Sequence, residues 1–241
     1  PLSFGSSEVL VEDFNGDGVL DVFNADFGHD FEPFEGGRNQ LLLGNGSGGF
    51  KDVSDRLPDL KDLTHSAAVG DIDGDGDQDI YVGNLSGFFD VTPYFLINDG
   101  DANFLLDRDR APFSLAPGPI ISDLNPRALS SELADINGDG AVDLLVGSDP
   151  TGQPERDFSR VFLNDGEGNF SDDRQIVLPA NPVAGGAFDL NLDIKVFDIN
   201  EDGLQDVIVL QTDDYSGWAI QFLIASSEGG FIDQTEALIV G

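Results

Sequence analysis

The chain has 241 residues and carries 46 acidic against 11 basic side chains, so its formal charge at pH 7 is −35. A surface of this sign repels the phosphates of nucleic acids, and no apolar run is long enough to cross a membrane, so nucleic-acid binding and membrane insertion are excluded. The absence of cysteine excludes disulfides, thiol catalysis and cysteine zinc sites, while a hydrophobic content of 40% is sufficient for a folded core.

An acidic nine-residue loop is the first distinctive feature along the chain. Residues 13–21 read DFNGDGVLD, and the pattern returns at residues 71–79, 135–143 and 198–206. The first aspartates lie at positions 13, 71, 135 and 198, so successive copies are 58, 64 and 63 residues apart. Four copies at nearly constant spacing indicate an internal repeat of about sixty residues.

A glycine-rich hairpin follows each acidic loop. The first reads LLGNGSGGF and ends at Phe50, and its counterparts end at Phe104, Phe170 and Phe231. These phenylalanines lie 37, 33, 35 and 33 residues after the first aspartate of their own repeats. Glycine and asparagine accept positive φ, so such clusters between apolar runs predict tight β-hairpin turns.

The segments between these turns predict four strands per repeat. In the first repeat the predicted strands are residues 8–14, 20–26, 40–43 and 50–53. No stretch shows a sustained helical period. Four strands in about sixty residues, repeated, predict an all-β fold in which each repeat is one four-stranded antiparallel blade of a β-propeller. We expect a single domain with blades at approximately residues 1–60, 61–122, 123–183 and 184–241.

The acidic loop and the hairpin together resemble the FG-GAP/VCBS repeats found in integrin α-subunit propellers and in many bacterial surface proteins. The resemblance covers essentially the whole chain and implies a calcium-binding β-propeller. Propellers of this family usually have seven blades, whereas four are visible here. A closed ring of four blades is physically allowed, but we expect the chain to be a fragment of a larger propeller.

Each acidic loop presents oxygen atoms at alternating positions. Positions 1, 3, 5 and 9 carry aspartate or asparagine, and position 7 offers a backbone carbonyl. Such hard ligands suit Ca²⁺, and the glycine at position 6 lets the chain wrap closely around an ion. We therefore predict four Ca²⁺ sites. The predicted ligands, with the carbonyl donor fourth in each set, are Asp13, Asn15, Asp17, Val19 and Asp21; Asp71, Asp73, Asp75, Asp77 and Asp79; Asp135, Asn137, Asp139, Ala141 and Asp143; and Asp198, Asn200, Asp202, Leu204 and Asp206.

An EF-hand loop opens in the same way, and it is excluded. It requires a glutamate at position 12 and flanking helices, whereas position 12 is Asn24 or a valine and the flanks read as strands. Mg²⁺ is a weaker candidate, because it prefers to keep its water shell. A further alternative is that the loops are Asp-Gly turns without an ion. Residues 189–193 share the alternating acidic spacing but lack the glycine turn, so they are predicted to be a loop.

The chain shows no catalytic constellation, so we expect it not to be an enzyme. His29 and His65 are the only histidines, and neither accompanies a nucleophile motif or a zinc-binding helix. Carboxylate pairs suitable for glycoside hydrolysis carry little information among 46 acidic residues. A carbohydrate-active lyase or hydrolase on a propeller scaffold stays open as an alternative.

The connections other than the acidic loops and the hairpins are long and irregular, as functional loops tend to be. If the acidic loops and hairpins share one face of the propeller, these connections lie on the opposite face. They carry or adjoin the aromatic residues Phe31, Phe34, Phe88, Phe89, Tyr215 and Trp218. Aromatic rings stack on sugars or anchor a protein partner, although packing between blades is an equal alternative.

The function most consistent with these features is a calcium-binding extracellular or cell-surface module that mediates adhesion or the recognition of a protein or glycan. A purely structural repeat of a surface protein or filament is the further alternative. Additional blades are expected from the rest of the polypeptide or from another subunit.

Overall fold

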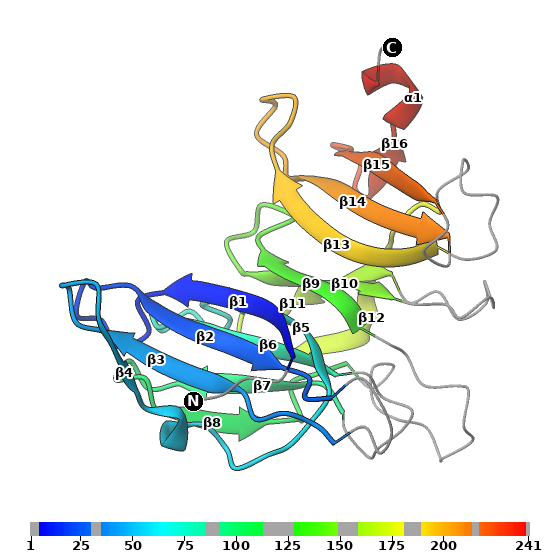
Figure 1. Cartoon of the computed structure of the whole chain (residues 1–241). Helices are drawn as coiled ribbons and strands as arrows, with labels where there is room; N and C mark the ends of the chain where they lie inside the picture. Colours follow the sequence, from blue (N-terminus) through cyan, green and yellow to red (C-terminus); the bar gives the residue numbers. More distant parts are fainter. Residues whose placement is uncertain are drawn as a thin grey trace.

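The computed structural model describes residues 5–29, 35–84, 92–112, 128–148, 159–180, 189–213 and 217–239, and all structural statements refer to these ranges. Within them, sixteen strands form four antiparallel sheets of four strands each, in which consecutive strands are hydrogen-bonded neighbours (Figure 1). The prediction of an all-β propeller built of four-stranded blades is confirmed. The two short helices are a 3₁₀ helix, η1 (Ser54–Arg56), and α1 (Thr235–Leu238).

Each sheet is one blade, and its strands follow one another along the chain. Blade 1 consists of β1 (Ser6–Glu12), β2 (Asp21–Asp26), β3 (Gln40–Gly44) and β4 (Phe50–Asp52). Blade 2 consists of β5 (Thr64–Gly70), β6 (Asp79–Asn84), β7 (Tyr94–Asn98) and β8 (Phe104–Asp107). Blade 3 consists of β9 (Ala128–Ala134), β10 (Asp143–Ser148), β11 (Arg160–Asn164) and β12 (Phe170–Val177). Blade 4 consists of β13 (Asp189–Phe197), β14 (Asp206–Asp213), β15 (Trp218–Ala225) and β16 (Phe231–Asp233).

The prediction that residues 189–193 form a loop is wrong. They lie in β13 and pair with β14, with an irregularity in the register between Asn191 and Asp193. The polar side chain of Asn191 is buried at this irregularity, where it accepts a hydrogen bond from Gln211 Nε2 at 2.8 Å and donates one to Ser159 Oγ. Because these partners satisfy the buried amide, a sequence without an obvious strand pattern continues the ladder.

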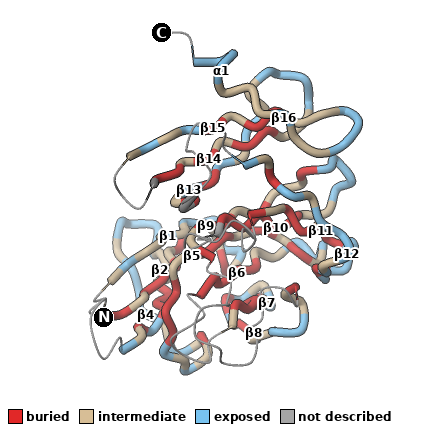
Figure 2. Tube along the Cα trace, turned by 90° about the vertical axis from the view of Figure 1, so that its right-hand side faces the viewer, coloured by how far each residue is buried: buried red, intermediate tan, exposed pale blue. Residues whose placement is uncertain are grey.

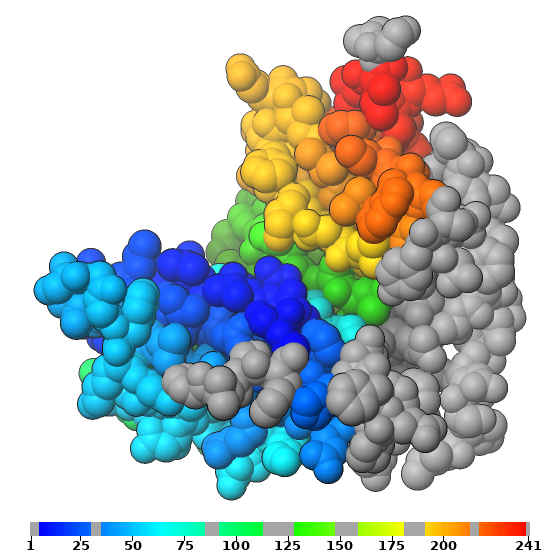
Figure 3. All heavy atoms as spheres, in the orientation of Figure 1, coloured from blue at the N-terminus to red at the C-terminus, as the bar shows by residue number. Residues whose placement is uncertain are grey.

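The first strands of the four blades form the inner edge of the assembly. β1 contacts β5, β5 contacts β9, and β9 contacts β13, so the blades follow one another around a common hub. Away from this hub the two end blades separate: blade 1, in blue and cyan, and blade 4, in yellow to red, diverge on the left of Figure 3. The four blades therefore form an arc.

Three apolar cores hold the arc together, one between each pair of successive blades. Side chains along a strand alternate between the two sides of a sheet. In β6, Ile80 and Val82 pack against blade 1 while Tyr81 packs against blade 3. Tyr81 lies beside Phe95, and Phe95 stacks on Phe170 with ring centroids 5.1 Å apart. Both sides of an inner blade are thus buried, as the red segments of Figure 2 show.

The direction of the strands sorts the connections onto two ends of the propeller. Consecutive antiparallel strands reverse direction, so the acidic loop after the first strand and the hairpin after the third lie at the same end of each blade. We call it the acidic-loop end. The connections after the second strand lie at the opposite, long-loop end. Of the predicted recognition aromatics, Trp218 begins β15 and is exposed; Phe31, Phe34, Phe88, Phe89 and Tyr215 lie outside the described residues.

Candidate metal centres

The backbone of all four acidic loops turns in the same way at two positions. Positions 4 and 6 have positive φ in every copy, which glycine adopts without strain. In the fourth loop the residue at position 4 is Glu201, with φ of 60°. A residue with a Cβ atom is strained in this region by about 1–2 kcal/mol. The fourth loop therefore keeps the shape of the others at a cost in stability.

In blades 1, 3 and 4 the side chains at positions 1, 3 and 5 turn back into their own loop. In the first loop, Asp13 Oδ2 accepts a hydrogen bond from the amide of Gly18 at 2.7 Å, Asn15 Oδ1 from the amide of Asp17 at 2.9 Å, and Asp17 Oδ1 from the amide of Val19 at 2.8 Å. The bond from position 6 to position 1 recurs in the other three copies, at Asp71, Asp135 and Asp198. The carboxylates are thereby oriented toward the interior of the loop.

The aspartate at position 9 has a second role that the sequence did not reveal. Asp79 is buried; its Oδ2 accepts the amide of Ile72 at 3.2 Å, and its Oδ1 accepts the amide of Asn98 at 2.8 Å. The same pair of bonds recurs in every blade, so this carboxylate ties the start of the acidic loop to the end of the third strand. The equivalent residues are Asp21, Asp143 and Asp206.

Burial makes the carboxylates of Asp79 and Asp143 costly to ionise in the absence of a cation. The pKa of Asp79 is raised to about 7, and burial is the main cause. The charges of Asp73 and Asp75 also raise this pKa, whereas the backbone hydrogen bonds from Asn98 and Ile72 lower it. Burial likewise raises the pKa of Asp143 to about 6. A divalent cation between such groups would offset both the loss of hydration and the mutual repulsion.

The loop of blade 2 brings three predicted ligands together. Oxygen atoms of Asp71, Asp73 and Asp79 all lie within 4.8 Å of one another. Asp73 Oδ1 is buried and forms no hydrogen bond of good geometry, so this carboxylate oxygen is only weakly compensated. The donors are all hard oxygen atoms, so the residues at this position fit a calcium ion.

One basic side chain adjoins this loop. Arg110 Nη2 lies 3.4 Å from Asp73 Oδ2, its Nε lies 3.2 Å from Asp107 Oδ2, and its Nη1 donates to the carbonyl of Glu167 at 2.7 Å. Arg110 therefore links the acidic loop of blade 2 to the hairpin of blade 3. It neutralises one oxygen of Asp73, while the other is only weakly compensated.

Two asparagines connect an acidic loop to the following blade. Asn98 Nδ2 of blade 2 donates to the carbonyl of Phe14 in the first loop at 2.9 Å. Asn164 Nδ2 of blade 3 donates to the carbonyl of Ile72 in the second loop at 2.7 Å. Blade 4 carries Ala225 at this position, which has no side-chain donor. We call these two contacts the asparagine clamps.

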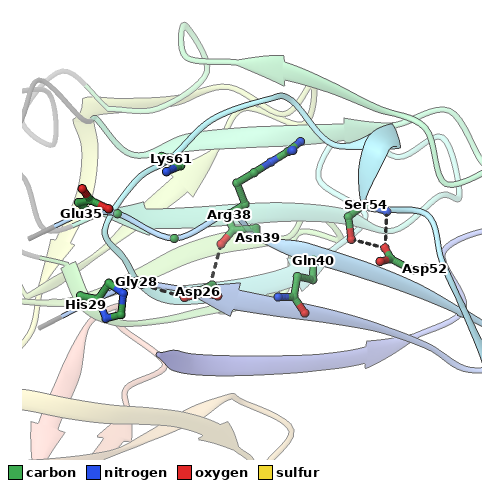
Figure 4. A pocket seen from close by; sticks show the side chains of 12 residues that line it. Asp26, Gly28, His29, Glu35, Arg38, Asn39, Gln40, Asp52, Ser54 and Lys61 are labelled. Carbon is green, nitrogen blue, oxygen red and sulfur yellow. Dashed lines mark hydrogen bonds between the residues drawn. The ribbon is translucent and has the colours of Figure 1, made fainter. Parts of the chain in front are cut away.

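A polar pocket lies at the long-loop end of blade 1 (Figure 4). Its volume is about 360 Å³. Asp26 at its base is buried, accepts the amide of Gly28 at 2.8 Å, and donates its own amide to Asn39 Oδ1 at 2.9 Å. The side chains around it offer both donors and acceptors: His29, Glu35, Arg38, Gln40, Asp52, Ser54 and Lys61. Such a mixed lining suits a polar ligand with several hydroxyl or amide groups.

Comparison with known proteins identifies the family. The FG-GAP-like repeat matches residues 8–82 and 135–209, more than half of the chain, and the FG-GAP repeat matches residues 64–102. The chain therefore belongs to the FG-GAP repeat family, and the resemblance seen in the sequence is confirmed. The FG-GAP and integrin relatives are not enzymes, in agreement with the expectation for this chain.

Individual relatives cover limited parts of the chain. Integrin alpha-3 of Mus musculus is 31% identical over 112 residues, and integrin alpha-3 of Cricetulus griseus is 30% identical over 112 residues. Each alignment covers 45% of this chain and 10% of the relative, so the match spans about a tenth of these relatives' length. The crystal structure of BBS1N in complex with ARL6DN, soaked with lead, has a TM-score of 0.47 and 13% identity, covering 97% of this chain and 55% of that chain. Among the described residues, no helix has the length and apolarity required to cross a bilayer.

Proposed function

We propose that this chain is a calcium-stabilised propeller module of an extracellular or cell-surface protein, and that it recognises a protein or glycan at its long-loop end. The observation that carries the calcium part is the acidic loop of blade 2, where the weakly compensated Asp73 Oδ1 lies in a cluster of three carboxylates. The repetition of the loop geometry in all four blades supports one ion per loop, held by the twenty predicted ligands.

The proposed ion has a structural role. Bound at positions 1, 3, 5, 7 and 9, it would join the two halves of the loop and balance carboxylates that otherwise repel one another. The second loop has four carboxylate ligands, Asp71, Asp73, Asp75 and Asp79, so it should bind most tightly. The fourth should bind less tightly, because Glu201 strains it.

A calcium titration tests this part of the proposal. Calorimetry on the chelated protein should give a stoichiometry of four, and Asp73→Asn should weaken the tightest class of sites. The matched control is Asp101→Asn, which removes one exposed carboxylate from the neighbouring hairpin without touching a predicted ligand. A stoichiometry of one or zero, or equal effects of the two substitutions, would reject the assignment.

The recognition part rests on the polar pocket of blade 1 and on the similarity to integrin alpha-3. The pocket lies at the end away from the acidic loops, and it gathers Arg38, Lys61 and His29 in a chain that has few basic groups. Several donors beside Asp26 and Glu35 match the alternating hydroxyl groups of a sugar or the polar backbone of a peptide.

A binding screen tests the recognition part. The labelled protein is applied, in calcium, to an array of glycans and to immobilised extracellular-matrix proteins. Binding that is weakened by Lys61→Ala but not by Lys51→Ala, a lysine of β4 outside the pocket, supports the proposal. Release of a shortened polysaccharide product would instead favour a carbohydrate-active enzyme, and binding to neither array would favour a purely structural repeat.

A further inference from the structure

The first and second contacts between successive blades share one feature at the acidic-loop end. Between blades 1 and 2, Nδ2 of Asn98 donates to the carbonyl of Phe14 at 2.9 Å and to the carbonyl of Gln78 at 3.1 Å. Phe14 is position 2 of the acidic loop of blade 1, and Gln78 is position 8 of the acidic loop of blade 2. One asparagine amide thus satisfies two backbone carbonyls, one from each of two neighbouring acidic loops.

The contact between blades 2 and 3 repeats this arrangement. Nδ2 of Asn164 donates to the carbonyl of Ile72 at 2.7 Å and to the carbonyl of Val142 at 2.9 Å, which are again position 2 of one loop and position 8 of the next. In both contacts a single nitrogen atom lies within hydrogen-bond distance of two carbonyl oxygens, so the two oxygens converge on one point. The repeat therefore builds a pair of convergent acceptors between neighbouring acidic loops.

The contact between blades 3 and 4 has the acceptors without the donor. Ile136 and Gln205 occupy positions 2 and 8 of the two loops, and Ala225 stands where the other blades have asparagine. The backbone amide of Ala225 donates to Asp206 at 2.8 Å, as the amides of the two asparagines do to position 9 of their own loops. A methyl side chain has no donor. Among the described residues, no group donates a hydrogen bond to the carbonyl of Ile136 or of Gln205.

A pocket of about 320 Å³ lies between these same two acidic loops, and Ile136 and Gln205 both line it. Glu132 of β9 forms part of its wall. Of the predicted calcium ligands, only Asp135 and Leu204 line the pocket, one from each loop. Each predicted ion lies within a single loop, so the pocket between the loops is a separate site.

The charges around this pocket favour a cation. No basic residue lines it, whereas Glu132 and Asp135 carry carboxylates. Lys195 lies 2.9 Å from Glu132, but it also lies 3.7 Å from Asp193 and acts electrostatically on Glu8, so three carboxylates share one ammonium group. Each of the two adjoining loops has three carboxylate ligands, so one Ca²⁺ per loop leaves both negative. The net charge of −35 adds a long-range attraction for cations.

The chain itself uses guanidinium groups to bridge blades. Nη1 of Arg110 donates to the carbonyl of Glu167 in the hairpin of blade 3 at 2.7 Å, and its Nη2 lies 3.4 Å from Asp73 in the acidic loop of blade 2. Nη1 of Arg56, which follows β4, donates to the carbonyl of Asp101 in the hairpin of blade 2 at 2.6 Å. Backbone carbonyls of this protein therefore already accept arginine at two contacts between blades.

We propose that the pocket between the third and fourth acidic loops binds the guanidinium group of an arginine side chain of a partner protein. Guanidinium is planar and has five N–H donors in a fixed fork, so it can donate to the carbonyls of Ile136 and Gln205 while its charge faces Glu132. The partner would supply the donors that the asparagine clamps supply at the other two contacts. Free arginine is disfavoured, because its own carboxylate meets the same negative surroundings. This site is separate from the recognition proposed for the long-loop end.

A titration with two matched compounds is the first test. Acetylarginine amide presents a guanidinium group without a free carboxylate, and acetylcitrulline amide has the same shape with a neutral head. In saturating calcium, acetylarginine amide should shift the backbone amide resonances of Gly138 and Gly203, which line the pocket, in a saturable way. Acetylcitrulline amide should bind about tenfold more weakly, because hydrogen bonds from a charged donor are stronger. Equal affinities, or no shift at either glycine, would overturn the proposal. Tighter binding of free arginine would assign the pocket to a free amino acid instead of a partner protein.

Ala225→Asn tests the pair of carbonyls without changing the charge of the protein. The new amide should donate to Ile136 and Gln205 as Asn98 donates to its two carbonyls, so the affinity for acetylarginine amide should fall by about tenfold or more. A thermal unfolding midpoint no lower than that of the wild type would show that the variant is folded. An unchanged affinity in the folded variant would contradict the assignment of these carbonyls as acceptors.

A second pair of variants separates the pocket from the overall charge. Glu132→Gln removes a carboxylate that lines the pocket and releases Lys195 from its partner, so binding of acetylarginine amide should weaken. Glu167→Gln is the matched control, because it removes one exposed carboxylate from the hairpin of blade 3 at the same end of the propeller, and it should leave the affinity nearly unchanged. Equal decreases in affinity for the two variants would show that the compound responds only to the net charge, and would overturn the proposed site.

Discussion

The amide nitrogen Nδ2 of Asn98 donates a hydrogen bond of 2.9 Å to the backbone carbonyl of Phe14, a residue of the acidic loop of the neighbouring blade. The backbone amide of the same Asn98 donates to Asp79, a predicted calcium ligand of its own blade. One asparagine thus connects the acidic loops of two blades. Asn164 repeats the arrangement one blade further along, between Ile72 and Asp143. The acidic loops and the packing of the blades are therefore coupled.

Removal of a clamp should destabilise the propeller. Asn98→Ala leaves the carbonyls of Phe14 and Gln78 without this donor, and we expect the free energy of unfolding to fall by about 1–3 kcal/mol. Urea unfolding in saturating calcium measures the change. The control is Asn103→Ala, whose side chain bonds the exposed Asp99 in the adjacent turn. Equal decreases in the free energy of unfolding of the two variants would mean that the hydrogen bond between the blades adds no stability beyond that of a bond within a turn.

The missing clamp of blade 4 offers the opposite experiment. Ala225 occupies the position of Asn98 and Asn164, and its amide already bonds Asp206 at 2.8 Å. Ala225→Asn should place a donor near the carbonyl of Ile136 and raise the free energy of unfolding by about 0.5–1.5 kcal/mol. Ala225→Leu is the matched control, because it adds bulk without a donor. Stabilisation by leucine as great as by asparagine would assign the gain to packing.

The fold was predictable because the sequence motifs that define it are local and occur once in every blade. The loop at residues 13–21 and its three copies combine ligand oxygens with glycines at positions of positive φ. The regular spacing of these four loops located the strands on either side of each. The clamps were not predictable, because Asn98 and Phe14 are 84 residues apart and an asparagine in a hairpin reads as a turn residue. The pocket was missed for a related reason, because it combines side chains from the segment around Asp26 with Lys61.

The strand at residues 189–197 shows a different limit. Its pattern of aspartate, asparagine and leucine resembles a loop, and Asn191 is buried only because Gln211 and Ser159 satisfy its amide. Those partners come from another strand and another blade. A local pattern therefore predicts an exposed or apolar strand well, whereas a buried polar strand depends on contacts that only the folded chain provides.

Replacement of Glu201 by glycine should stabilise the fourth blade. Glu201 has φ of 60°, whereas its equivalents Gly16, Gly74 and Gly138 occupy this region without strain. We expect Glu201→Gly to raise the free energy of unfolding by roughly 1 kcal/mol, since relief of strain exceeds the extra flexibility of the unfolded chain. Glu228→Gly, at an exposed turn with ordinary φ, should destabilise or have no effect. Destabilisation by Glu201→Gly would show that the loop tolerates the side chain without strain.

Asp62 should make stability depend on pH. It is buried, and burial raises the pKa of its carboxyl despite hydrogen bonds from Tyr94 at 2.7 Å and Thr64 at 3.1 Å. Because the folded-state pKa is raised, the stability due to this group is complete below the pKa of the unfolded chain, about 4, and is lost as pH rises through the folded value. Asp62→Asn removes this titration. The free energy of unfolding of the wild type relative to the variant should therefore fall as the pH rises above about 4.

Chemical denaturation of both proteins at fixed calcium over this range measures the difference. The comparison removes the titration of the acidic loops, which the two proteins share. Parallel pH profiles would show that the Asp62 carboxyl titrates alike in the folded and unfolded chains. If the free energy of unfolding of the wild type instead rose with pH relative to the variant, the pKa of Asp62 would be lowered in the folded chain. Tyr94 and Thr64 would then stabilise the charged form more than burial disfavours it.

Removal of calcium should lower the melting temperature of the whole arc. An ion that binds only the folded state adds about 2.7 kcal/mol per site when its concentration is a hundred times the dissociation constant. The asparagine clamps connect the first loop to blade 2 and the second loop to blade 3, so loss of the ions should weaken the contacts between blades as well as the loops. Melting in calcium and in EDTA, at equal ionic strength, measures the effect.

Two variants separate the ion from the clamp. Asp73→Asn should reduce the calcium-dependent part of the melting temperature, because Asp73 supplies the weakly compensated oxygen of the second loop. Asn164→Ala should lower the melting temperature in both buffers, because its bond to Ile72 persists without an ion. If the clamp transmits the effect of the ion, the melting temperature of the double variant Asp73→Asn/Asn164→Ala should fall by less than the sum of the decreases in the two single variants. Strict additivity, or equal melting temperatures in calcium and EDTA for the wild type, would refute the coupling between the acidic loops and the blades.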